Sequence, residues 1–186
     1  MGDFSSEKDS AFPGVQPAAM SRVEFVRIFG TVYEKSPWVA ERAWDQGLTP
    51  ADNSRQGLRI TLAGIVDRAG RDAQLGLLRS HPDLAEGLAE RGRLSEASAS
   101  EQAGAGLDQC SPAEYAEFQA LNARYTGTFG FPYILAVRGR DRQQILENFR
   151  SRIDNNAEAE FAEALRQVHR IAALRLQQIG TTPASA

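Results

Sequence analysis

Helix start signals recur along nearly the whole chain, and they constrain its fold more than any other feature. A capping residue followed three positions later by Glu or Gln is typical of a helix N-terminus, because the two side chains satisfy free backbone N–H groups. Such pairs are Ser21 with Glu24, Ser98 with Glu101, Ser111 with Glu114, and Asp141 with Gln144. Ser36-Pro37 fits a further start, with Ser as N-cap and Pro in the first turn. Apolar residues at helical spacing follow these signals. The sequence predicts an all-α fold, a single-domain compact bundle of about eight helices.

One apolar run does not fit this helical pattern. In the stretch 129–137, Gly130 and Pro132 break helices, and the residues after them are apolar and partly β-branched. No second convincing strand exists to pair with this run. We therefore expect one extended segment buried among the helices. Its backbone N–H and C=O groups must still find partners, which a polar ligand lying along it could supply.

Length and composition set the expected organisation of the chain. With 186 residues, the chain is long enough for one sizeable core. Residues 1–19 are rich in Ser, Asp, Pro and Gly and are expected to form a mobile tail. The helical domain is predicted to span 20–180, followed by a short C-terminal tail at 181–186.

Charge and cysteine content limit the partners and the compartment. The net charge of −3 argues against nucleic acid or an anionic membrane as the main partner. No apolar run approaches the length needed to span a membrane. Cys110 is the single cysteine, so an internal disulfide is impossible, and we expect a reducing compartment such as the cytoplasm.

The first candidate for chemistry is His81, one of two histidines. Pro82 disfavours helical backbone at the residue before it, so His81 is expected where a helix ends. Glu101 comes twenty positions later, at the predicted start of another helix. A titratable imidazole and a carboxylate can form an acid–base pair. Two structural alternatives remain open: Glu101 could only cap its helix with Ser98, and His81 could be a structural residue.

The last predicted helix, from about residue 157 to 179, carries a second candidate. Its apolar stripe includes Phe161 and Val168, and the next position at the same spacing is Arg175. A cation among core residues is costly unless it is paired. Arg175 is therefore expected either to reach an internal carboxylate or to line a pocket that receives an anion. The planar guanidinium suits a carboxylate because it can bind both oxygens.

The sequence carries no signature of a metal or cofactor. It has no cluster of Cys and His with zinc-ligand spacing and no glycine-rich phosphate loop. We therefore expect no cofactor and no metal.

Six segments together resemble the 2-oxo-4-hydroxy-4-carboxy-5-ureidoimidazoline (OHCU) decarboxylase family. They are YEKSPWVAERAW (33–44), LRSHPDLA (78–85), SASEQAGAGLD (98–108), NARYTGTFGFPYILAVRG (122–139), RIDN (152–155) and IAALRL (171–176). They occur in the family's order and cover nearly everything after the tail. The resemblance implies an all-helical, cofactor-free enzyme, commonly a dimer, that decarboxylates OHCU to (S)-allantoin in urate degradation. The resemblance thus implies a small-molecule substrate, a ureidoimidazoline carboxylate, as the partner, and a homodimer as the assembly.

The resemblance also implies roles for particular residues. His81 would be the catalytic acid–base, Glu101 its partner and Arg175 the site arginine. Substrate-binding positions would be Pro82, Ser98, Ala99, Ser100, Glu101, Gln102, Tyr133, Ile134, Leu135, Ala136 and Val137. Arg152 is the second candidate for the arginine, because RIDN also resembles a family signature. Ile153 stands where the family usually has Leu, a departure that changes little.

Two other classes of function remain as alternatives. His-Pro-Asp between helices is also the signature of J-domains, which stimulate Hsp70 chaperones. Their preceding helix is strongly basic, whereas DAQLGLLRS at 72–80 has one Arg and no Lys. The other alternative is an all-helical scaffold without an active site, for which His81→Ala would leave function unchanged.

Overall fold

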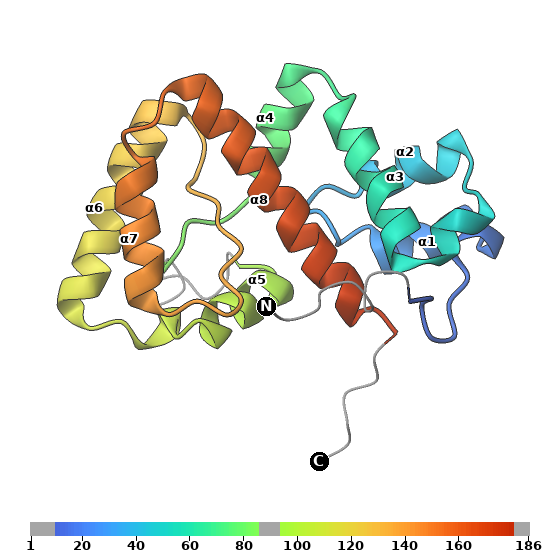
Figure 1. The fold of residues 1–186 in the computed structure, drawn as a ribbon, viewed down its shortest axis with the longest axis horizontal. Coiled ribbons are helices and arrows are strands. Elements are labelled where there is room, and N and C mark those ends of the chain that lie inside the picture. The colour runs from blue at the N-terminus through green and yellow to red at the C-terminus, as the bar shows by residue number, and fades with distance from the viewer. Residues whose placement is uncertain (1–9, 86–93, 181–186) are drawn as a thin grey trace, which may run out of the picture. The chain divides into compact units, whose positions relative to one another are not determined.

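A computed structural model of the protein describes residues 10–85 and 94–180 (Figure 1). The predicted all-α class is confirmed: these residues form eight α-helices and no strand. The helices are α1 (Arg22–Phe29), α2 (Trp38–Gln46), α3 (Arg55–Asp67), α4 (Arg71–Arg79), α5 (Glu96–Gly104), α6 (Pro112–Phe129), α7 (Arg142–Arg152) and α8 (Ala157–Gln178). Short 3-10 helices lie at Pro17–Ala19, Pro50–Asn53 and Leu107–Gln109.

Contacts between Cα atoms divide the chain into two compact units, where the sequence led us to expect one domain over 20–180. Of the described residues, 10–74 and 169–180 belong to unit 1, and 75–85 and 94–168 belong to unit 2. The helices α4 and α8 therefore contribute residues to both units. Each unit has its own buried residues and is described by itself below.

Local capping explains why several helices begin where the sequence predicts. Ser21, Ser111 and Asp141 are the N-caps of α1, α6 and α7, and each forms a reciprocal capping box with the residue three positions later. Ser54 caps α3 by accepting the Gly57 N–H at 3.0 Å. The start predicted at Ser36 is wrong by one residue, because Pro37 is the N-cap of α2 and no side chain caps that end.

The helix predicted to begin at Ser98 begins one turn earlier. Its N-cap is Ser95, whose Oγ accepts the Ser98 N–H at 3.2 Å, so α5 starts at Glu96. Ser98 is therefore the third helical residue, and Glu101 lies in the second turn of α5. Both serines are competent caps, and the sequence pattern favoured the one followed by Glu. Glu101 is thus not in a capping position.

Residues 10–19 are not the mobile tail that their composition predicts. Phe12 is 3% exposed and packs edge-on against Phe29, with the ring centroids 5.3 Å apart. Arg55 donates from Nη1 to the Ala11 carbonyl at 2.7 Å. One aromatic anchor and one arginine thus attach a polar segment to the rest of unit 1. The remaining tail residues, 1–9 and 181–186, lie outside the described part of the chain, as do most of 84–94, where the sequence favours a short helix.

Unit 2 contains the predicted buried extended segment. Gly130 ends α6 in a left-handed conformation, with φ +75°, which a glycine adopts without strain. The chain then continues without helix or strand, and Tyr133–Val137 are all at most 4% exposed. Tyr133 stacks on Phe149, with centroids 3.7 Å apart, and edge-on against Tyr125. The helices α6 and α7 lie side by side next to this segment in unit 2 (Figure 1).

Candidate functional site

His81 lies just beyond the end of α4, as predicted from its place before Pro82. The side chain is buried, with 8% exposure, and its Nδ1 is 3.0 Å from the Leu77 carbonyl oxygen. A carbonyl oxygen only accepts hydrogen bonds, so Nδ1 carries a proton. In the neutral imidazole, Nε2 is then the nitrogen that can take up a proton. The last turn of α4 thus fixes both the tautomer and the direction of the ring.

The turn that follows His81 is attached to α5. Gln102 accepts the Ala85 N–H through Oε1 at 3.0 Å and donates through Nε2 to the Asp83 carbonyl at 3.3 Å. Both ends of this amide therefore bind backbone atoms of the turn. Gln102 follows Glu101 directly in the sequence. These bonds therefore attach the helix that carries Glu101 to the turn that follows His81.

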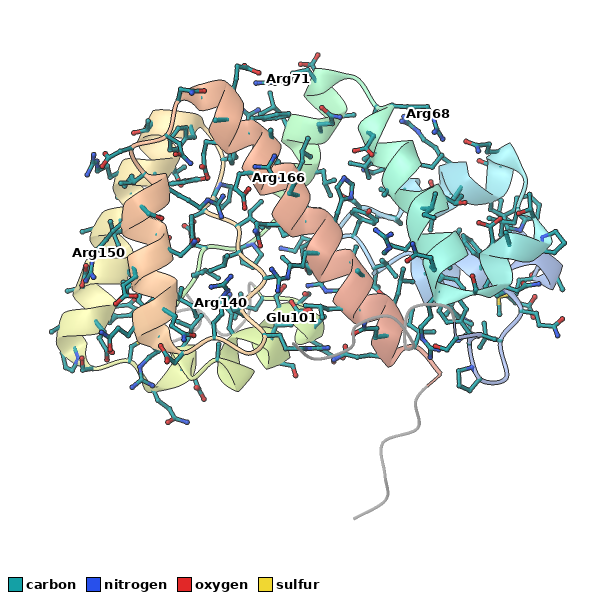
Figure 2. The ribbon with its side chains drawn as sticks, viewed as in Figure 1. Arg68, Arg71, Glu101, Arg140, Arg150 and Arg166 are labelled. Atoms are coloured by element: carbon teal, nitrogen blue, oxygen red, sulfur yellow. The ribbon has the colours of Figure 1, made fainter. Side chains whose placement is uncertain are left out.

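The predicted substrate-binding residues of α5 divide between two faces of that helix. Ser98, Glu101 and Gln102 are spaced by three and four positions and share one face. Ser98 and Gln102 are buried, and Glu101, labelled in Figure 2, is half-buried. Ala99 and Ser100 are exposed. The face that carries Glu101 is thus the one attached to the turn after His81.

The buried segment 133–137 is held by polar contacts at alternate positions. Ile134 accepts from Arg152 Nη1 at 2.7 Å through its carbonyl, and Ala136 donates its N–H to Gln167 at 3.0 Å. The Tyr133 hydroxyl donates to Asn148 at 2.6 Å. The protein itself thus partners several polar groups of this segment, which fixes its backbone before any ligand binds.

Arg152 is the centre of a buried charged cluster in unit 2. Its Nε and Nη2 donate to one oxygen of Glu160, at 2.9 Å and 2.5 Å, and its guanidinium lies 4.6 Å above the Tyr133 ring. Burial opposes the charge of Arg152, but hydrogen bonding to Glu160 raises the pKa of the guanidinium above its ordinary value. Arg152 is therefore a cation whose charge is balanced inside the protein.

The carboxylate of this cluster was not predicted from the sequence. Glu160 is completely buried, and it accepts hydrogen bonds from Arg152, from the Tyr125 hydroxyl and from Asn155. Burial, with hydrogen bonding to Glu160, raises the pKa of Tyr125. The signal in the sequence is weak: Glu160 stands in the first turn of a long helix, where acidic residues are common.

Arg175 belongs to unit 1, where it is paired with an internal carboxylate. It is 6% exposed, and its Nη1 lies 2.9 Å from an oxygen of Glu34, which is 2% exposed. A weaker bond of 3.4 Å reaches the Thr31 carbonyl. The apolar stripe of α8 thus does contain this cation, and an ion pair compensates its burial, as the first of the two sequence alternatives proposed.

Other polar residues of the described chain contribute less to a site. His169 bridges Tyr33 and Asp67 in unit 1, at 2.8 Å and 3.0 Å. Burial, with the nearby Glu114, raises the pKa of the Cys110 thiol, which disfavours the nucleophilic thiolate. Residues 10–85 and 94–180 contain no cluster of three or more side chains suited to a metal ion. In the same ranges, no helix has the length and apolar character required to cross a bilayer.

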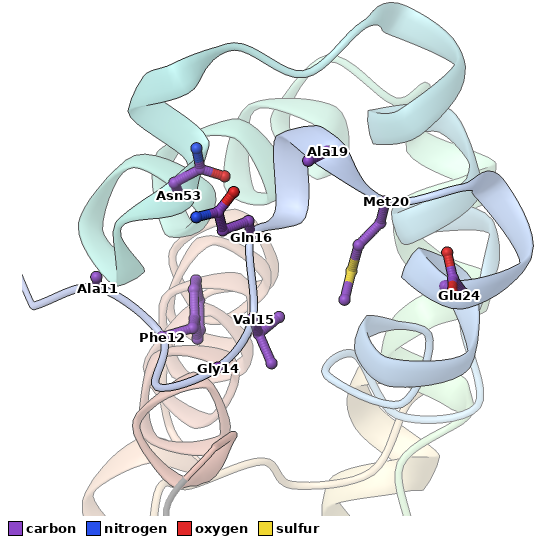
Figure 3. Close-up of a pocket in the computed structure, with 9 residues that line it drawn as sticks. All are labelled: Ala11, Phe12, Gly14, Val15, Gln16, Ala19, Met20, Glu24 and Asn53. Atoms are coloured by element: carbon purple, nitrogen blue, oxygen red, sulfur yellow. The ribbon is translucent and has the colours of Figure 1, made fainter.

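A hollow of about 540 Å³ lies in unit 1, on the segment that precedes α1 (Figure 3). Its lining residues are Ala11, Phe12, Gly14, Val15, Gln16, Ala19, Met20, Glu24 and Asn53. None of them is a predicted site residue, and Glu24 already serves the cap of α1. The hollow therefore does not coincide with the candidate chemistry.

Comparison with known proteins identifies the family. The model of the OHCU decarboxylase family matches residues 18–177. The OHCU decarboxylase of Halalkalicoccus jeotgali is 44% identical over 155 residues, which cover 83% of this chain and 84% of that protein. That of Haloferax volcanii is 44% identical over 154 residues, covering 83% of this chain and 88% of that one.

A solved structure agrees with these relatives. The crystal structure of (S)-allantoin synthase superimposes with a TM-score of 0.69 at 30% identity, covering 86% of this chain and 50% of that one. The family match includes His81-Pro82-Asp83, so the J-domain alternative is not retained. The chain belongs to the OHCU decarboxylase family.

Proposed function

We propose that this protein decarboxylates OHCU to (S)-allantoin without a cofactor. The observation that carries the proposal is His81, a buried imidazole of defined tautomer within a chain that matches the family over 18–177. The named relatives at 44% identity support the same substrate.

The substrate makes cofactor-free decarboxylation chemically reasonable. Its carboxylate is attached to a ring carbon that also carries a hydroxyl and neighbours a ring C=N bond. When the bond to CO₂ breaks, its electron pair forms a C=C bond while the C=N pair moves to nitrogen, which takes up a proton. Protonation of the neighbouring carbon and loss of the hydroxyl proton then give the ring amide carbonyl of allantoin. The ring thus serves as the electron sink that a cofactor otherwise supplies.

His81 is suited to the proton transfers in this sequence. With Nδ1 bound to the Leu77 carbonyl, Nε2 can accept the hydroxyl proton and return a proton to carbon. A group held in one direction protonates one face of the ring, which accounts for a single enantiomer. Positioned acid–base catalysis typically contributes about 10²–10⁴ in rate.

Glu101 and the buried segment have supporting roles in the proposal. A carboxylate near an imidazole favours its protonated form. Glu101 lies on the same face of α5 as Gln102, which binds the turn after His81.

The amide edges of the substrate's ureido group would be recognised by Ser98 and by backbone groups within Tyr133–Val137. On the family resemblance we keep Arg175 as the proposed partner of the substrate carboxylate, which would then share the guanidinium with Glu34, 2.9 Å from Nη1. Arg152 is not proposed for this role, because it binds Glu160 and the Ile134 carbonyl.

We further propose that the protein is a homodimer of the cytoplasm. The single cysteine, Cys110, needs no oxidising compartment and supports the cytoplasm. The dimer rests on the family resemblance alone. Sedimentation of the purified chain measures its mass in solution, and a monomer at working concentration would contradict the dimer.

The activity is tested with OHCU freshly generated by enzymatic oxidation and hydrolysis of urate. Purified protein should speed the loss of OHCU and produce one enantiomer of allantoin, followed by absorbance and circular dichroism. Spontaneous decay gives the racemate, so the optical signal separates catalysis from background. Turnover that disappears with EDTA and returns with zinc would contradict the cofactor-free mechanism, and racemic product at the background rate would contradict the activity.

Replacing Glu101 with Gln tests its proposed role as the partner of His81. Because Glu101 is not in the cap of α5, the change should leave the melting temperature nearly unchanged. We expect kcat to fall about tenfold or more. The acidic limb of the pH–rate profile should move to lower pH, because no anion then favours the protonated imidazole. The matched control is Glu96→Gln, an exposed carboxylate in the first turn of the same helix. Wild-type kcat and pH profile in Glu101→Gln would remove the carboxylate from the mechanism.

A further inference from the structure

The turn after His81 is also bound by a side chain that the family resemblance does not assign to the site. Asn122 lies in α6, is 4% exposed, and donates from Nδ2 to the Leu84 carbonyl at 2.9 Å. Together with Gln102 on α5, it binds three consecutive residues of the turn: Asp83, Leu84 and Ala85. Two helices of unit 2 thus hold one short piece of backbone.

The conformation of this turn requires such support. Ala85 has φ +61°, in the left-handed region that residues with a Cβ rarely occupy. Backbone strain of this kind persists only where the surroundings determine the conformation, and it gathers at functional sites. Here the Ala85 N–H is fixed by Gln102, and the preceding carbonyl is fixed by Asn122.

The chemistry of Asn122 indicates why an amide occupies this position. Its Oδ1 is buried and has no hydrogen-bond partner among the residues that the structure describes. A buried acceptor without a partner is unfavourable, and an apolar side chain of similar size would avoid it. Packing alone therefore does not favour Asn here. An apolar residue at this position would lack the N–H donor that binds the Leu84 carbonyl.

We propose that Asn122 is a positioning residue for His81, acting through the turn Asp83–Ala85. This inference rests on the proposed role of His81. The imidazole is attached to α4 through Leu77, and its backbone continues through Pro82, whose ring fixes φ, into the bound turn. A shift of the turn therefore moves the His81 backbone, while the Nδ1 bond holds the ring to α4. By holding the turn in place, Asn122 keeps the His81 backbone in the position that the Nδ1 bond to Leu77 requires. Nε2 then points in one direction.

The test uses Asn122→Leu in the full-length protein, with two readouts. We expect kcat to fall roughly tenfold while KM stays within about twofold, because a small displacement of a catalytic group affects the chemical step most. The second readout is the ring signals of His81 in ¹⁵N-labelled protein. Because the chain has two histidines, His169→Gln assigns both sets. The His81 signals should move and the His169 signals should stay.

The control is Thr61→Val, which removes a hydrogen bond to Asp52 in unit 1. It should change neither kcat nor the His81 signals. If Asn122→Leu does not fold, Asn122→Ala removes the same donor with less bulk, and the same changes are expected. Wild-type His81 signals in a folded donor-free variant would overturn the inference, whether or not the enzyme is active. Absence of OHCU turnover in the wild-type protein would instead count against the proposed function.

Discussion

Asn in place of His81 should lower kcat by about 10² or more while the protein remains folded. Asn lacks a group that exchanges protons near neutral pH, yet its amide can still donate to the Leu77 carbonyl that Nδ1 binds. The substitution therefore abolishes proton transfer by this side chain but can keep its hydrogen bond to α4. The measurement is the rate of OHCU loss and the enantiomer formed, beside the melting temperature and the far-ultraviolet circular dichroism.

The matched control for His81→Asn is His169→Asn. His169 is the other histidine, it is also hydrogen-bonded, and it bridges Tyr33 and Asp67 in unit 1. We expect this control to keep kcat within about twofold of the wild-type value. A folded His81→Asn variant with an unchanged rate would remove His81 from the mechanism. Equal losses in both variants would mean that the effect is not specific to His81.

Much of the fold could be predicted because its signals are local. Ser21, Ser111 and Asp141 begin helices through bonds to residues three positions away, and the sequence contains both partners of each bond. His81 was placed correctly for the same reason, since Pro82 acts on the residue directly before it. The buried segment was predicted from Gly130 and Pro132 followed by an apolar run.

The predictions fail where the local structure depends on a distant contact or on a choice between two similar residues. Ser95 and Ser98 can both cap a helix, and the structure uses Ser95. Composition predicted a mobile segment around Phe12, but that ring packs against Phe29, which is seventeen residues away in the sequence. Composition describes the average character of a segment. A single buried aromatic side chain is enough to attach that segment to the rest of the protein.

The partners of buried charges could not be found from the sequence at all. The stripe of α8 shows that Arg175 is costly unless paired, but nothing in the pattern identifies Glu34. The same holds for Arg152, whose resemblance to a family signature suggested contact with substrate. Its contacts with Glu160 and the Ile134 carbonyl depend on folding α7, α8 and the buried segment together. The sequence therefore indicates which residues to consider for the candidate site, but not which side chains hold them in place.

Removing the carboxylate of Glu160 should destabilise the protein strongly. In Glu160→Ala, Arg152 stays buried without its counter-ion, and the Tyr125 hydroxyl and Asn155 lose an acceptor. Breaking one side of a buried ion pair typically costs about 3–5 kcal/mol. For a chain of this size, that corresponds to a melting temperature lower by roughly 6–20 °C. Thermal and urea unfolding of the variant measure both quantities.

Two further variants separate the buried pair from ion pairs in general. Asp154→Ala breaks the exposed pair of Arg124 and Asp154, which has a similar distance of 2.8 Å, and should hardly change the melting temperature. The double variant Arg152→Met with Glu160→Leu removes both charges and should recover much of the stability lost in Glu160→Ala. It still lacks the donor to the Ile134 carbonyl, so turnover should stay below the wild-type rate because the segment 133–137 is less firmly held. A double variant with wild-type kcat would show that Arg152 contributes only to stability, and a Glu160→Ala variant as stable as Asp154→Ala would contradict the buried pair itself.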